Sequence, residues 1–323
     1  MRPRRQPSTG RTFAALLAAT AAAALVATAP APASTGNSDL PIPVVDAGGG
    51  LRKRVAIHDG RRLFIACRGS GSPTVVLEAG TGDVGRVWSL APFGPGRAVL
   101  PAVARFTRVC VYDRPGTYLL PDEFSRSDPV AMPRTALDIA GDLRALLRAA
   151  RVPGPYVLAG HSFGGMVARL YATRYPTQVA GLVSIDAQNE DFVAAYKEFL
   201  SPEQYVAAVL DPGPPPGLDY PEFERLALEA SAAQTKQAQA DTPLRRMPFV
   251  VLSHSRDLPN PFGFPSDWPI DALDHAFQRS QMALAGLLPR ARLVEAKRSG
   301  HYIQLDQPRL VTREIRWVVR RAR

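Results

Sequence analysis

Apolar residues occur in this chain in two spacings that alternate from about residue 54 to the C-terminus. Short continuous runs bounded by turn residues are typical of buried strands, whereas apolar residues repeated every three or four positions are typical of amphipathic helices. The runs predict strands at 54–58, 62–67, 74–78, 108–112, 155–158, 179–185, 249–253 and 291–295. The repeats predict helices at 135–150, 164–174, 269–288 and 308–319. This βαβ alternation predicts an α/β fold, with helices on both faces of a mostly parallel sheet.

Two segments depart from this alternation. Asp59-Gly60 separates the first two strands and is a hairpin signal, so we expect those strands to be antiparallel. From about 188 to 247 no strand is predicted, and three amphipathic stretches appear at 192–200, 202–210 and 221–237. We therefore expect one domain, residues 51–323, that carries a helical cap insertion at about 188–247.

Residues 1–33 have the features of a signal peptide. Four arginines and no acidic residue occupy positions 1–12, and an uncharged apolar run follows from Phe13 to Ala27. This run is shorter than the ~20 residues needed to cross a bilayer, and Ala31-Pro32-Ala33 provides an A-x-A cleavage site. We expect cleavage after Ala33, a flexible linker at 34–50, and a secreted protein without stable membrane association. Retention of residues 1–33 as an anchor is the alternative.

The net charge does not indicate a nucleic-acid partner. Residues 1–33 hold four of the 39 basic residues and none of the 29 acidic ones, so cleavage lowers the formal charge from +10 to +6. The remaining basic residues include a C-terminal cluster, Arg313, Arg316, Arg320, Arg321 and Arg323, at spacings that place several of them on the solvated face of a terminal helix. No aromatic residues are interleaved with them as base-stacking platforms, so we expect no binding of nucleic acid.

The two cysteines, Cys67 and Cys110, lack the spacing of a zinc site. No metal centre and no cofactor are therefore predicted. In an exported chain two cysteines can pair if the fold brings their Cα atoms within about 7 Å. The topology of the fold decides this point.

Gly160-His161-Ser162-Phe163-Gly164 lies between a predicted strand and a predicted helix. This is the context of a G-x-S-x-G nucleophile elbow, in which the serine sits on a sharp turn with its hydroxyl exposed. Gly160 and Gly164 allow strand and helix to approach closely. The motif predicts that Ser162 is a nucleophile, and a glycine-rich turn with an inert serine is the alternative.

A serine hydroxyl needs a base, usually a histidine held in one tautomer by a carboxylate. Of the five histidines, His301 lies in the loop between the last strand and the last helix, at the edge where α/β proteins place their active sites. The other four are interpreted as structural histidines: His58, His161, His254 and His275.

For the orienting acid, three aspartates remain open. Asp257 follows the strand at 249–253 and fits the chain order Ser, Asp, His, so it is favoured. Asp186, at the end of the preceding strand, and Asp267 are the rivals. For the oxyanion hole, the expected donors are the backbone N–H groups of Phe163 and Thr81.

The sequence resembles the α/β-hydrolase family, in particular its haloperoxidase-like and proline-iminopeptidase-like branch with a helical cap. The resemblance covers about residues 52–320. It is carried by GSGSPTVVLEAGTG at 69–82, VCVYDRPG at 109–116, VLAGHSFGGMVARLYATRYP at 157–176 and SGHYIQLDQP at 299–308.

The resemblance implies an eight-stranded, mostly parallel sheet and catalytic roles for Ser162 and His301, with Asp257 at the family's usual acid position. It also places the second strand beside the fourth, which implies a disulfide between Cys67 and Cys110. The chain departs from the family pattern at Ala79, where a histidine is usual. Two further departures are the missing glycine before Asp257 and the continuation of DRPG as TYLLP.

These features predict a serine hydrolase that cleaves an ester or related acyl bond of a small molecule through an acyl-enzyme. One alternative is an aminopeptidase of the proline-iminopeptidase type, in which acidic cap residues hold a substrate ammonium group. Glu222, Glu224 and Glu229 are the candidates for that role. The other alternative is a binding protein on the same fold that has no turnover.

Overall fold

The structure is a computed structural model of the 323-residue chain and describes residues 50–323 except 91, 120–121 and 216. The predicted signal peptide, its cleavage site and all but the last residue of the predicted linker at 34–50 lie outside the described residues. Within the described part, no helix combines the length and the apolar character needed to cross a membrane.

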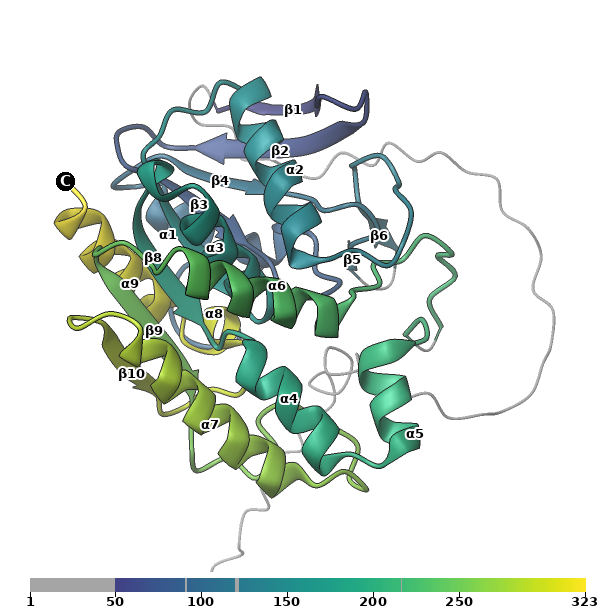
Figure 1. The fold of residues 1–323 in the computed structure, drawn as a ribbon. Coiled ribbons are helices and arrows are strands. Elements are labelled where there is room, and N and C mark those ends of the chain that lie inside the picture. Colours follow the sequence, from purple (N-terminus) through teal and green to yellow (C-terminus); the bar gives the residue numbers. More distant parts are fainter. Residues whose placement is uncertain (1–49, 91, 120–121, 216) are drawn as a thin grey trace, which may run out of the picture.

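The centre of the molecule is an eight-stranded sheet with the order β1-β2-β4-β3-β7-β8-β9-β10 (Figure 1). β2 is antiparallel to both β1 and β4, and the other neighbouring strands are parallel. The strands are β1 Arg52–Ala56, β2 Arg62–Arg68, β3 Thr74–Glu78, β4 Val109–Tyr112, β7 Tyr156–His161, β8 Val179–Ile185, β9 Phe249–His254 and β10 Arg292–Ala296. The predicted α/β fold, the mostly parallel sheet and the hairpin at Asp59-Gly60 are confirmed.

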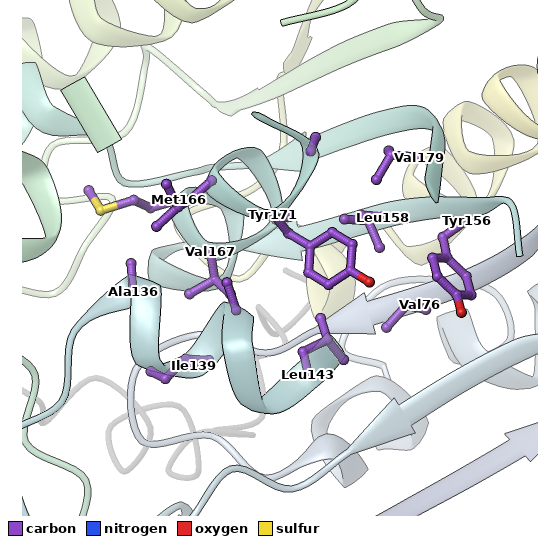
Figure 2. Packing of buried hydrophobic residues seen from close by; sticks show 14 of the residues in the cluster. Val76, Ala136, Ile139, Leu143, Tyr156, Leu158, Met166, Val167, Tyr171 and Val179 are labelled. Carbon is purple, nitrogen blue, oxygen red and sulfur yellow. The ribbon is translucent and has the colours of Figure 1, made fainter. Parts of the chain in front are cut away.

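Helices cover both faces of the sheet and bury side chains that alternate along its strands. In β7, Leu158 faces one apolar cluster whereas Val157 and Ala159 face the other. The cluster in Figure 2 joins the sheet to α2 and α3. The α-helices are α1 Val99–Val103, α2 Ala136–Ala149, α3 Phe163–Arg174, α4 Glu190–Phe199, α5 Pro202–Tyr205, α6 Leu228–Asp241, α7 Ile270–Gly286, α8 Ile303–Asp306 and α9 Pro308–Arg321.

Smaller elements complete the described chain. They are the 3-10 helices η1 Gly85–Ser89 and η2 Pro176–Gln178, the π-helix η3 Val206–Leu210, and the hairpin of β5 Tyr118–Leu119 and β6 Glu123–Phe124. Local sequence explains where some elements begin. For example, Thr135 and Asp138 form a reciprocal capping box at the start of α2.

The segment between β8 and β9 forms α4, α5, η3 and α6, and several of its residues line the cavity that contains Ser162. The stretch predicted as a helix at 202–210 is divided into α5 and the π-helix η3. The helix predicted at 221–237 begins only at Leu228. The preceding residues instead bind other loops through their backbone: Glu224 N–H donates to Gly116 O, and Ala227 N–H donates to Arg134 O. These long-range hydrogen bonds replace the helical ones that periodicity predicts.

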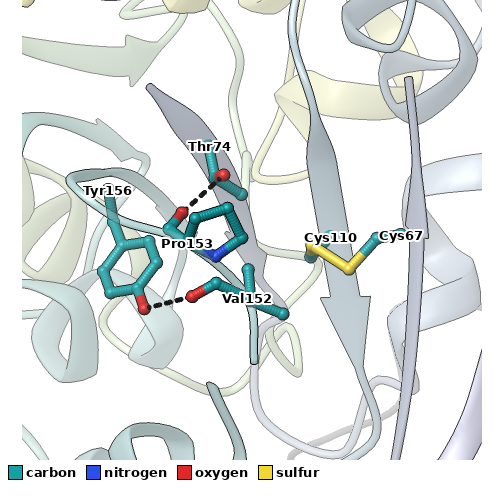
Figure 3. Close-up of a disulfide and its surroundings, with 6 residues drawn as sticks. All are labelled: Cys67, Thr74, Cys110, Val152, Pro153 and Tyr156. Atoms are coloured by element: carbon teal, nitrogen blue, oxygen red, sulfur yellow. Dashed lines mark hydrogen bonds between the residues drawn. A yellow bond between two sulfur atoms is a disulfide. The ribbon is translucent and has the colours of Figure 1, made fainter. Parts of the chain in front are cut away.

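Cys67 and Cys110 form a disulfide between β2 and β4 (Figure 3). The two residues are direct partners in the antiparallel register, so their side chains project from the same face at the same level. The bond closes a loop with a sequence separation of 43 residues and fastens the antiparallel edge to the parallel part of the sheet. The pairing implied by the family resemblance is confirmed.

Candidate active site

Ser162 occupies a strained turn between β7 and α3. Its φ of 52° and ψ of −127° lie outside the regions that L-residues usually adopt. Neighbouring segments hold this conformation, because Ser162 N–H donates to Ile185 O at 3.1 Å and Ser162 O accepts from the N–H groups of Gly165 and Gln188. A strained residue fixed by its surroundings is a frequent feature of functional sites.

The glycines beside Ser162 are required by space. A Cβ on Gly160 would lie 2.3 Å from the carbonyl oxygen of Gly164, and a Cβ on Gly164 would lie 2.3 Å from that of Ala79. Both contacts involve backbone atoms, which cannot move aside cheaply. The sequence motif therefore forms the sharp strand-to-helix turn that it predicts.

His301 lies in the loop between β10 and α8 and lines the same cavity as Ser162. Its backbone N–H donates to Pro261 O at 2.9 Å, which fixes the loop. The ring Nδ1 lies 2.7 Å from Oδ2 of Asp186. With Nδ1–H donating to a carboxylate, Nε2 is the nitrogen left to accept a proton.

Asp186 is thus the carboxylate that the structure brings to His301, in place of the favoured Asp257. Asp257 and the third candidate, Asp267, are both exposed. Among the described residues, no side-chain hydrogen bond joins either of them to His301. β9 ends at His254, and the chain then turns to the surface before it reaches Asp257, whereas Asp186 follows directly on the buried end of β8. The expectation for Asp257 is therefore corrected.

Asp186 is fully buried and receives several hydrogen bonds. His254 N–H donates to Oδ1 at 2.8 Å, and the His254 ring Nδ1 lies 2.9 Å from Oδ2. Burial alone would raise the pKa of Asp186, but the charge and hydrogen bonds of His254 and His301 hold this pKa below its usual range. The carboxylate is therefore ionised at neutral pH.

The sequence pattern predicts a structural histidine at His254 and does not predict its contacts with Asp186. The available signal was its position as the last residue of a buried strand at the carboxyl edge of the sheet. His161 fits the structural interpretation better, because it is buried and its Nε2–H donates to His301 O at 3.0 Å. Burial and the neighbouring His301 lower the pKa of His161 to about 3, so its ring is neutral.

The expected oxyanion donors lie on two different elements. Phe163 is the first residue of α3, where a backbone N–H has no acceptor within the helix and the helix dipole is positive. Thr81 belongs to the loop after β3 and lines the cavity. Both positions suit the stabilisation of an oxyanion at Ser162.

The loop at 79–82 is held by a buried guanidinium and a cap residue. Arg114 donates to the carbonyl oxygens of Ala79 and Gly80 at 2.8 and 2.5 Å, and Gly82 N–H donates to Oε2 of Glu224 at 2.8 Å. Arg114 also forms buried ion pairs with Glu78 and Glu224. Since Glu224 lies in the segment between β8 and β9, the cap directly fixes the loop that carries Thr81.

The cavity above Ser162 is lined mainly by apolar and aromatic side chains. Among the described lining residues, Glu224 is the only carboxylate, and both of its oxygens are occupied by Arg114 and Gly82. The aromatic lining residues are Tyr118, Phe192, Tyr196, Phe223, Phe262, Phe264, Trp268, Phe277 and Tyr302. In the described part of the chain, no group of three or more His, Cys, Asp or Glu side chains is arranged to hold a metal ion.

The amino-acid sequence was compared with protein families and with individual proteins. A model of the alpha/beta hydrolase family matches residues 75–314. An AB hydrolase superfamily protein of Gibberella zeae is 24% identical over 313 residues, with 81% of this chain and 92% of that protein covered. A probable transporter, efuK, of Hormonema carpetanum is 27% identical over 302 residues, with 80% of this chain covered. The chain spans 41% of the length of efuK.

Solved structures share the fold. Cfl2 from Burkholderia cenocepacia superposes with a TM-score of 0.55 at 22% identity, covering 84% of this chain and 95% of that one. A thermophilic esterase from Thermogutta terrifontis gives a TM-score of 0.51 at 21% identity, covering 84% and 99%.

We expect Arg114→Met to lower the free energy of unfolding by about 3–5 kcal/mol, because it leaves Glu78 and Glu224 buried without their cation. The measurement is urea denaturation followed by circular dichroism. The matched control is Arg86→Met, which removes a partly exposed ion pair with Glu123 and should cost about 1 kcal/mol or less. Equal, small losses in both variants would contradict the role assigned to Arg114.

Proposed function

The chain belongs to the alpha/beta hydrolase family, and on this basis we propose that it is a serine hydrolase that cleaves an ester or related acyl bond. The observation that carries the proposal is the arrangement of three residues. Ser162 sits on a strained turn, His301 lines the same cavity, and Asp186 lies 2.7 Å from Nδ1 of His301. These are the parts that acyl transfer to a serine requires.

In the proposed reaction, His301 Nε2 takes the proton of the Ser162 hydroxyl while Oγ attacks the substrate carbonyl carbon. The carbonyl oxygen becomes an oxyanion, which the backbone N–H groups of Phe163 and Thr81 stabilise. Collapse of this intermediate breaks the bond to the leaving group, which receives the proton from His301. Water then attacks the acyl-enzyme with His301 again as base, and the acid product and the free Ser162 hydroxyl are released.

The charge of the cavity favours a neutral substrate over one with a free amino group. An aminopeptidase of the proline-iminopeptidase type needs a carboxylate to hold the substrate ammonium group. Of the three acidic residues considered for that role, Glu222 and Glu229 are exposed and do not line the cavity. Glu224 lines it but is paired with Arg114. This pairing supports an ester substrate and counts against the aminopeptidase.

We also propose that the protein is exported. The proposal is supported by the charged and apolar segments of residues 1–33, with their A-x-A site, and by the Cys67–Cys110 disulfide. Disulfides form and persist mainly in oxidising compartments.

We expect the protein to hydrolyse p-nitrophenyl esters and Ser162→Ala to remove this turnover, because the change deletes the attacking oxygen and no core volume. Hydrolysis is followed by absorbance for a series of acyl lengths, which also reports the size of the acyl site. Absence of turnover with every ester would favour a binding protein without catalysis. Substantial turnover by Ser162→Ala would exclude Ser162 as the nucleophile.

Replacement of the two rival acids separates their roles. Asp186→Asn should lower kcat by about two to four orders of magnitude with little change in KM, because the carboxylate orients and stabilises the imidazolium without touching substrate. Asp257→Asn should leave kcat nearly unchanged, since this side chain is exposed. Circular dichroism checks that both variants fold. A severe loss in Asp257→Asn, with an active Asp186→Asn, would reverse the assignment.

A further inference from the structure

His254 joins two carboxylates that come from different elements. It is the last residue of β9, and its side chain is fully buried. Its ring Nδ1 lies 3.0 and 2.9 Å from the two carboxylate oxygens of Asp186. Its ring Nε2 lies 2.6 Å from Oδ1 of Asp274 on α7. Asp274 thus reaches His301 through an unbroken series of contacts.

The geometry determines the protonation of this ring. A neutral imidazole has one N–H donor and one acceptor, whereas an imidazolium has two donors. An ionised carboxylate only accepts, so hydrogen bonds to both Asp186 and Asp274 require both nitrogens of His254 to carry a proton. Two carboxylates and one imidazolium then leave a single net negative charge for His301 to face.

Aromatic rings fix the plane of His254. Phe277 stacks on it with ring centroids 5.1 Å apart and an angle of 23° between the planes. Phe262 meets it edge-on at 5.0 Å. The side-chain amide nitrogen of Gln278 lies 2.9 Å from Nε2, and its oxygen lies 2.9 Å from Ser253 Oγ. The oxygen and nitrogen of an amide are assigned from their hydrogen bonds, and a protonated Nε2 requires the reverse assignment, with the Gln278 oxygen accepting from Nε2–H and the nitrogen donating to Ser253 Oγ. The titratable groups that contact the ring among the described residues are Asp186 from the end of β8 and Asp274 from α7, with His301 on the far side of Asp186.

We propose that Asp274 and His254 extend the series Ser162–His301–Asp186, with His254 as a cationic positioning residue that aims the Asp186 carboxylate at His301. The inference rests on the proposed hydrolase function. His254 supplies Asp186 with two donors, its backbone N–H and its ring Nδ1–H, so the carboxylate cannot rotate away from His301. Asp274 acts one step further away, by keeping the ring of His254 charged.

The direction of the pKa shift of His254 agrees with this geometry. Burial would lower the pKa of His254, but the charge of Asp186 and the hydrogen bonds with Asp186 and Asp274 raise this pKa to about 9. A raised pKa means that the protonated ring stabilises the fold fully below the ordinary histidine pKa near 6.5. This contribution is lost as the pH rises through about 9.

The first test compares Asp274→Asn with Asp271→Asn, which removes an exposed carboxylate from the same helix. For Asp274→Asn we expect kcat to fall about tenfold with little change in KM, by analogy with the losses found when the outer partners of metal-binding residues are removed. The acidic limb of the pH–rate profile should also move to higher pH. The variant loses the Asp274 charge and, with it, the positive charge of His254. Because Asp274 binds the side of the His254 ring that faces away from Asp186, the nearer, positive charge has the larger effect on His301, and its loss removes a repulsion that opposes protonation. Asp271→Asn should leave both quantities unchanged.

The second test uses the wild-type protein and does not depend on activity or on the folding of a variant. Nitrogen-15 NMR of labelled histidine, assigned through the backbone, reports whether each ring nitrogen carries a proton. We expect both nitrogens of His254 to be protonated at pH 7 and one to lose its proton near pH 9. A neutral His254 ring at pH 7 would overturn the inference.

Failure of the inference differs from failure of the proposed function. Active wild-type protein, together with an Asp274→Asn variant that has the same kcat and the same acidic limb, would overturn the role of His254 and Asp274 alone. Wild-type protein without esterase turnover would overturn the proposed hydrolase and this positioning role together. In that case the NMR result would still establish the charge of His254.

Discussion

The buried carboxylate of Asp186 is the interaction on which the rest of the site depends. It lies at the end of β8, accepts from the backbone and ring of His254 at the end of β9, and accepts from His301 in the loop after β10. One side chain therefore fixes three neighbouring strand ends relative to one another. A carboxylate buried this deeply stays ionised only because donors surround it. The same donors set the orientation in which His301 faces the cavity.

A second buried charge cluster holds the loop at 79–82, which also lines the cavity. Arg114 binds two carbonyl oxygens of the loop at 79–82 and pairs with Glu224 from the cap. A buried pair of this kind contributes little to net stability but is costly to break. The Arg114 ion pairs therefore fix the positions of the segments that they join. Glu224, between β8 and β9, is thereby held to the loop that carries Thr81.

Much of this arrangement could be predicted from the sequence. Strand and helix periodicity gave most boundaries within two residues, and G-x-S-x-G between strand and helix identified the turn at Ser162. The carboxylate that contacts His301 could not be predicted, because Asp186 and Asp257 each follow a strand. The strand pattern does not show that the loop after β9 carries Asp257 to the surface. The helix predicted to begin at residue 221 begins only at Leu228, for a related reason. Residues 221–227 hydrogen-bond to loops distant in sequence, and such long-range contacts cannot be predicted from helical periodicity.

The central claim is that Ser162 is a nucleophile activated by His301 and Asp186. Its most direct test is labelling with a fluorophosphonate, which bonds to an activated serine hydroxyl, followed by peptide mass spectrometry. The account predicts one adduct on the peptide that contains Ser162, with labelling much slower in Asp186→Asn at the same pH. No adduct in folded wild-type protein, or an adduct at a serine outside the cavity, would contradict it.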